Sequence, residues 1–166
     1  AATKTLDALY GVEPPPAAET IRRVFYNLFM IEDHLLHFFF LGGPDFIVGP
    51  TAPKAERNIL GVVEKVGLDV SRQLIDMRGR IRSLMATIGG KPIHPVLGLP
   101  GGVAKQLTEE IRAELKVVAA DAVKFTQFSL KAFDDIVLGN KQYVDLITSD
   151  TYSQATYYMG MVDKNN

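Results

Sequence analysis

The chain has 166 residues, 47% of them hydrophobic, which is enough for one domain with a sizeable buried core. Its 18 basic and 19 acidic residues give a formal net charge of -1 without long runs of like charge, so a nucleic-acid-binding protein is not indicated. No cysteine is present, which excludes disulfides, thiolate clusters and a cysteine nucleophile built from this chain alone.

A long apolar helix dominates the first third of the chain. Residues 2–10 have helical spacing, and the apolar run from Pro16 to Leu41 predicts a second, longer helix that is buried on nearly every side. Arg22 and Arg23 are its only expected solvated patch, and Gly42-Gly43-Pro44 is expected to end it. Charged residues interrupt the run, so we expect neither a membrane span nor export, and we predict a cytoplasmic protein.

Polar residues gather on one stripe of this helix. Met30, Asp33, His34 and His37 fall within an arc of about 100° when each residue turns by 100°. A metal site is one reading, but it needs about four ligands and the chain has only one further histidine. Acid–base chemistry by Asp33 with a histidine is a second reading. A buried, hydrogen-bonded histidine pair is the simpler alternative.

The middle of the chain predicts two more helices and a rigid loop. Spacing of apolar residues indicates helices over residues 55–66 and 68–88, the second with a basic face and ended by Gly89-Gly90. Residues 91–102 hold three prolines and three glycines around His94, which indicates an irregular loop. The basic face is expected to be solvated or to meet another subunit, and it consists of Arg72, Arg78, Arg80 and Arg82.

The last third predicts an unusually long helix. Thr108 and two acids open a helix that runs to Leu138, about 45 Å at 1.5 Å per residue. Residues 141–147 predict a short helix, and residues 151–162 have strand-like composition. We therefore predict an all-α fold, a long antiparallel helix bundle in a single domain over 1–166, with a short strand near the C-terminus left open.

Two segments resemble the large subunit of [NiFe] hydrogenases. IRRVFYNLFMIEDHLLHFFFLGGPDF is similar to that family's segment with Ile-Arg followed by a His-x-x-His-Phe motif, and GRIRSLMATIGGKPIHPVLGLPGGV is similar to its helix that ends in Gly-Lys-x-x-His-Pro. The order and separation of the two segments agree with the family as well. The resemblance covers essentially all 166 residues and is greatest to the cytoplasmic, methyl-viologen-reducing or bidirectional type.

The resemblance implies a nickel–iron centre with cyanide and carbon monoxide ligands in the intact subunit, which would oxidise H₂ or reduce protons. The family holds that centre with two Cys-x-x-Cys motifs, and neither occurs here. We therefore expect an interior fragment of a larger subunit that is inactive alone and binds no metal or cofactor. The resemblance places Asp33, His34 and His37 around the centre without contacting it, and His94 and Lys91 at the contact with an iron–sulfur subunit.

The expected partners are the iron–sulfur small subunit and the remainder of the large subunit. Apolar faces that the rest of the subunit would cover are expected to favour self-association of the fragment. The alternative is a non-enzymatic helical module, an interaction scaffold that docks through its arginine-lined helix and its Gly-Pro loop. Whether this chain belongs to an enzyme is therefore left open by its own residues.

Overall fold

The computed structural model describes residues 2–155 and 157, and most of them are helical. The chain divides into two compact units, Ala1–Ser129 and Leu130–Asn166, which we describe separately. The prediction of an all-α protein is confirmed at this level. The prediction of a single domain stays a prediction, and so does the prediction of a helix bundle of the hydrogenase type.

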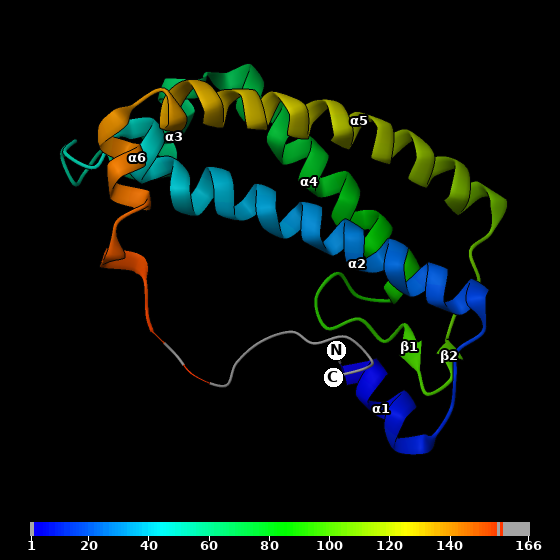
Figure 1. Ribbon diagram of the computed structural model, residues 1–166. Coiled ribbons are helices and arrows are strands. Elements are labelled where there is room, and N and C mark those ends of the chain that lie inside the picture. Colours follow the sequence, from blue (N-terminus) through cyan, green and yellow to red (C-terminus); the bar gives the residue numbers. More distant parts are fainter. Residues whose placement is uncertain (1, 156, 158–166) are drawn as a thin grey trace. The chain divides into compact units, whose positions relative to one another are not determined.

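Three long helices form the first unit, α2 (Pro16–Leu36), α4 (Leu68–Gly89) and α5 (Glu109–Phe133), of which α5 continues into the second unit. Figure 1 shows α2 and α5 running in the same direction, with α4 crossing them in the opposite one. Their facing sides supply most of the core, and Ile81 and Leu84 of α4 are almost completely buried. The buried cluster comprises Phe25, Leu28, Leu35, Phe39, Leu74, Met77, Ile81, Leu84, Met85, Ile88, Leu97, Val118, Ala122 and Phe125.

The long apolar helix does not end where its glycines predict. It continues after Leu36 as π-helix over His37–Gly42 and again over Pro44–Val48. Proline in an α-helix clashes with the carbonyl four residues earlier, whereas the wider π turn moves that carbonyl away. The predicted stop at Gly42-Gly43-Pro44 is therefore wrong, and the helical rod ends at Gly49 with φ 118°.

By length and composition alone, one described stretch, Pro16–Gly42, could cross a membrane. Core helices of soluble proteins pass the same criterion, and here Phe25, Leu28 and Leu35 pack into the core of the first unit. The expectation of no membrane stays a prediction.

Helix α3 (Ile59–Val66) is shorter than the predicted 55–66 helix because Asn58 caps it. The Asn58 side-chain oxygen accepts hydrogen bonds from the backbone N–H of Leu60 and of Gly61, at 2.8 and 3.2 Å. Such a cap satisfies donors that the first helical turn leaves free. Residues 55–57 are consequently turn and bend.

The predicted irregular loop contains a two-stranded hairpin, β1 (Gly98–Leu99) paired antiparallel with β2 (Gly102–Val103). These are the only strands among the described residues. The strand predicted over 151–162 is wrong where it is described, since Asp150–Tyr152 form a 3-10 turn and residues 153–155 have no regular structure. Residues 156 and 158–162 lie outside the described part of the chain.

Arg22 joins the hairpin to α1 (Ala2–Tyr10) and α2. Its guanidinium pairs with Asp7 at 2.6 Å and donates to the backbone carbonyls of Leu99 and Gly102, at 2.7 and 2.8 Å. Asp7 in turn accepts from the N–H of Gly101 at 2.8 Å. The prediction of Arg22 as a solvated residue is wrong, because only 15% of its side chain is exposed.

The Arg22–Asp7 anchor predicts a specific loss of stability in acid. The hydrogen bond from Arg22 lowers the pKa of Asp7 below its ordinary value of 3.8, and the Gly101 N–H lowers it further. A depressed carboxyl pKa stabilises the folded state fully above pH 3.8, and this contribution disappears as the pH falls through the folded-state pKa. We therefore measure the free energy of unfolding in urea at pH 7 and below pH 3.8. Its decrease between the two pH values should be smaller for Asp7→Asn than for the unmodified chain. Glu19→Gln, which removes an exposed ion pair, is the control and should keep the original pH dependence; equal loss in Asp7→Asn would contradict this account.

The second unit contains the end of α5, the π-helical turn Asp134–Leu138 and α6 (Lys141–Ile147). The prediction of a short helix over 141–147 is confirmed. Asn140 caps it, accepting from the backbone N–H of Gln142 at 3.0 Å. Exposed ion pairs one turn apart, Lys131 with Asp135 and Lys141 with Asp145, run along these helices.

Candidate functional site

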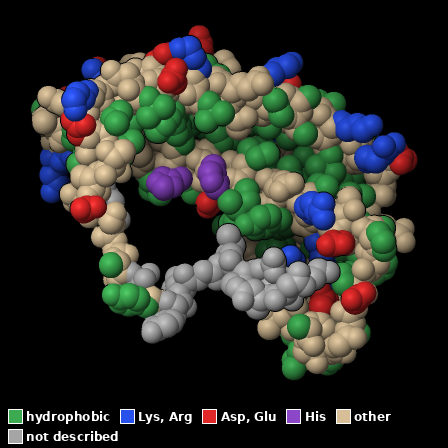
Figure 2. All heavy atoms as spheres, in the orientation of Figure 1, with side chains coloured by type: hydrophobic (Ala, Val, Ile, Leu, Met, Phe, Trp, Pro, Cys, Tyr) green, Lys and Arg blue, Asp and Glu red, His purple; other side chains and the backbone are tan. Residues whose placement is uncertain are grey.

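The predicted polar stripe, at the end of α2 and the start of the following π-helix, lies on the surface. Asp33, His34 and His37 are all exposed, and the His34 ring nitrogen Nδ1 bonds to the Met30 carbonyl at 2.7 Å. Figure 2 shows histidine side chains lying at the surface beside hydrophobic ones. The expectation that this face of the helix is buried is wrong for these three side chains. Their polar groups are therefore accessible for contacts with another molecule or chain segment.

Glu32 is the buried acid of this helix, and sequence analysis missed its role. Its Oε1 accepts from Arg78 at 2.6 Å and from Arg82 at 3.4 Å, both on α4. The Arg78 guanidinium also lies 5.0 Å from the centre of the Phe40 ring. The basic face of α4 is thus partly internal, and its expected role as a solvated surface is wrong for Arg78. Helical spacing places Glu32 on the buried face with Leu28 and Leu35, but its partner Arg78 is 46 positions away in sequence, so a local pattern does not reveal the contact.

Lys91 and His94 lie on the loop that follows α4, and both are exposed. His94 has φ 53°, a left-handed conformation that costs a non-glycine residue about 1 kcal/mol. The loop starts beside Phe25, since a Cβ at Gly89 would lie 2.5 Å from that ring. Asp33 is eight residues further along α2, about 12 Å. The structure therefore keeps the two groups of predicted site residues apart.

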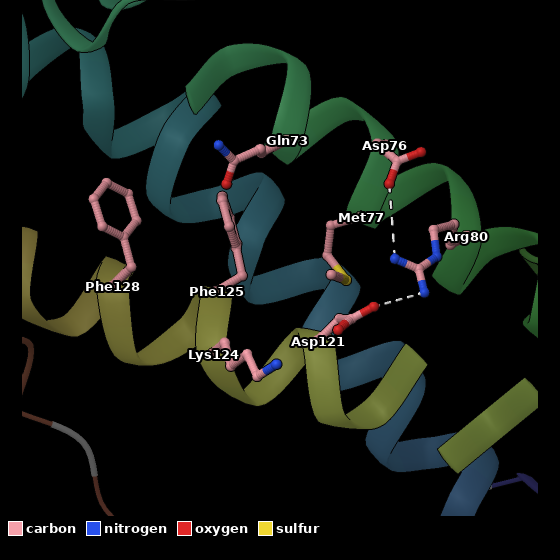
Figure 3. Close-up of a pocket in the computed structure, with 8 residues that line it drawn as sticks. All are labelled: Gln73, Asp76, Met77, Arg80, Asp121, Lys124, Phe125 and Phe128. Atoms are coloured by element: carbon pink, nitrogen blue, oxygen red, sulfur yellow. Dashed lines mark hydrogen bonds and ion pairs between the residues drawn. The ribbon is translucent and has the colours of Figure 1, made fainter. Parts of the chain in front are cut away.

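A groove of about 380 Å³ lies between α4 and α5. Figure 3 shows Arg80 placed between Asp76 and Asp121, with its nitrogens 3.8 and 2.9 Å from their carboxylates. Apolar and polar side chains share its wall, and the lining residues are Gln73, Asp76, Met77, Arg80, Asp121, Lys124, Phe125 and Phe128. The arginine is neutralised by its own acids, so the groove is an ion-paired seam between helices.

No protein-family profile matches the chain, but several curated proteins do. It is 42% identical over 163 residues to an iron-sulfur subunit of the F420-non-reducing hydrogenase of Archaeoglobus profundus, covering 98% of this chain and 34% of that protein. It is also 42% identical over 162 residues to a vhu-type F420-non-reducing hydrogenase subunit of Methanocaldococcus jannaschii, covering 98% of this chain and 38% of that protein. The chain thus spans little more than a third of the length of these relatives.

Two further relatives extend the similarity to NAD-reducing enzymes. The NAD-reducing hydrogenase HoxS subunit beta of Cupriavidus necator is 28% identical over 141 residues, which are 81% of this chain and 29% of that protein. A crystal structure of an NAD+-reducing [NiFe]-hydrogenase in the H2-reduced state superposes with a TM-score of 0.81 at 30% identity, covering 90% of this chain and 33% of that one.

These comparisons support the predicted resemblance to hydrogenases but contradict the predicted subunit. The Archaeoglobus relative is named an iron-sulfur subunit, so the assignment of this chain to a nickel–iron large subunit is corrected, and with it the function and the nickel–iron cofactor expected from that assignment. The relatives are named as subunits, which agrees with the expectation of a further hydrogenase subunit as partner. The expected roles are reversed, because the name of the Archaeoglobus relative places the iron-sulfur subunit on the side of this chain and not of its partner.

An iron–sulfur cluster does not fit the residues of this chain. Such clusters are held by cysteine thiolates, with histidine as an occasional substitute, and the sequence has no cysteine. In addition, residues 2–155 and 157 contain no group of three acidic or histidine side chains suited to a metal ion. We therefore assign no chemical step to a cluster within this segment.

Proposed function

We propose that this chain is a helical segment, about one third, of a subunit of a hydrogenase of the F420-non-reducing kind. The observation that carries the proposal is 42% identity over 163 and 162 residues to two such subunits from different archaea. Similarity of fold to a hydrogenase chain, with a TM-score of 0.81, supports a packing of α2, α4 and α5 like that of hydrogenases. The whole protein would act on H₂, and this segment would supply scaffold and contact surfaces.

The exposed residues suit contact surfaces better than an autonomous active site. Asp33, His34 and His37 lie on the surface of the first unit, where the remainder of the hydrogenase would cover them. Lys91 and His94, on a loop held rigid by prolines, would meet a further hydrogenase subunit. Exposed apolar side chains such as Leu60 and Leu68 support the expectation that the isolated segment self-associates. We also propose the cytoplasm as its location, which fractionation of the host cells would test.

The proposal is tested on the natural polypeptide that carries this sequence, tagged and purified without oxygen from its host. We expect further hydrogenase subunits to co-purify, as identified by mass spectrometry, and the preparation to reduce benzyl viologen under H₂. The same preparation under argon is the control and should reduce no dye. Co-purification of unrelated proteins without H₂-dependent reduction would overturn the proposal and favour the non-enzymatic scaffold.

A further inference from the structure

Every arginine of the chain is ion-paired with an acid inside the chain. Six of the eight arginines pair with at least one acid that no other arginine contacts, and Arg80 pairs with two such acids, Asp76 and Asp121. The other five arginines of this kind form the pairs Arg22 with Asp7, Arg23 with Glu19, Arg57 with Asp45, Arg72 with Asp69 and Arg112 with Glu109. Arg78 and Arg82 depart from this pattern, because they share Glu32.

The sharing is unequal. Both guanidinium groups reach the same oxygen of Glu32, but Arg78 does so at 2.6 Å and Arg82 only at 3.4 Å. The side chain of Glu32 is 8% exposed and that of Arg78 17% exposed, so their pair is largely removed from water. Arg82 is 40% exposed and keeps the rest of its N–H groups for another acceptor. Among the residues that the structure describes, the cluster therefore carries one positive charge in excess, with its outer donor at the surface.

The surroundings indicate what that acceptor is. A charge excess beside a buried pair is stabilised by an opposite charge, and arginine binds carboxylates through two parallel N–H donors. Phe29 is one helical turn before Glu32, so it lies on the same side of α2, and it is 40% exposed. Aromatic and arginine side chains are enriched in the contacts between polypeptides, which favours an acceptor on another polypeptide segment.

We propose that Arg82 binds the carboxylate of an aspartate or glutamate on a polypeptide segment outside residues 1–166. The acid would complete the cluster, leaving Glu32 to Arg78 and giving Arg82 an acid of its own. The inference rests on the proposed function in one respect, namely that the segment belongs to the same hydrogenase.

The test uses Arg82→Lys in the natural polypeptide, purified with its partners. This change keeps the positive charge and introduces an amine that a carbodiimide couples directly to a carboxylate in contact with it. Arg72→Lys is the matched control on the same helix, since Arg72 is 76% exposed and, within the described part of the chain, is ion-paired with Asp69 alone, at 3.7 Å. Mass spectrometry locates the coupled acids in both variants, and thermal unfolding confirms that each is folded.

We expect the amine at position 82 to couple to an acid outside residues 1–166, whereas the amine at position 72 should couple to Asp69. Coupling at position 82 to Glu32 alone, coupling there to a phosphate group, or none there while the control couples would each overturn the proposal. The hydrogenase assignment is read separately from H₂-dependent dye reduction by the same preparations. An active complex without the outside coupling would therefore refute only the role of Arg82.

Discussion

Replacing Gly61 by alanine should destabilise the first unit by about 3 kcal/mol, because the new methyl group has no room. A Cβ built at Gly61 would lie 2.0 Å from the backbone oxygen of Glu56 and 3.3 Å from Val48. The Glu56 oxygen cannot easily move aside, since it accepts a hydrogen bond from the N–H of Asn58 at 2.8 Å. Relief of the clash would therefore disturb the residue that caps α3. Urea unfolding followed by circular dichroism measures the loss.

Gly79→Ala is the matched control for this prediction. Gly79 lies inside α4, and nothing lies within 4 Å of the position that the Cβ of an alanine would take there. Alanine is a better helix former than glycine, and we expect this variant to gain about 0.5 to 1 kcal/mol. Equal effects of the two substitutions would show that helix propensity, and not the close approach of Glu56, governs Gly61.

Replacing Glu32 by alanine should cost about 3 kcal/mol, because it leaves two arginines facing each other without their acid. Arg78 would lose its 2.6 Å bond while remaining largely buried over Phe40. Its Nε already has no hydrogen-bond partner, so the guanidinium has little other compensation within the described residues. The measurement is the free energy of unfolding in urea at neutral pH.

Asp33→Ala tests whether burial causes that loss. Asp33 is the neighbouring acid on the same helix, but it is exposed, and surface substitutions of this kind change stability by less than about 0.5 kcal/mol. A third variant, Glu32→Ala combined with Arg78→Met, removes the uncompensated charge and should recover part of the loss. If the double variant is no more stable than Glu32→Ala alone, the charge is not the cause.

The sequence predicts the helices well where local signals decide. Gly90, which follows α4 at φ 75°, and the asparagine before α6 act through neighbouring backbone groups, so their effect is visible in a short stretch. Thr108 likewise accepts from the backbone N–H of Ile111 at 3.4 Å, as its position before two acids predicts. Element type and ends follow from such residues with little reference to the rest of the chain.

The sequence predicts the polar contacts poorly, because their partners are distant. Helical spacing places Arg22 on the side of α2 that holds Ala18 and Phe25, and Arg23 on another side, but no local signal shows that Arg22 reaches Asp7 and a hairpin some 80 positions away. Likewise, helical spacing separates the buried Glu32 from the exposed Asp33, but the arginine partners of Glu32 are 46 and 50 positions away. The sequence motifs predicted a similarity to hydrogenases, which the comparisons support. They also predicted a large subunit, which the name of the Archaeoglobus relative contradicts.

In the π-helical stretch after Leu36, the packing of the aromatic side chains depends on the number of residues as well as on their types. A π turn advances by roughly 80° per residue, so three successive side chains span a narrower arc than the 200° of an α-helix. Phe38, Phe39 and Phe40 can therefore all contact the core, with Phe39 at its centre and the other two packed against it. Deleting one residue here would tighten the turn and swing one of the three rings toward solvent. The aromatic run is thus sensitive to a change in residue number even where every remaining side chain is kept.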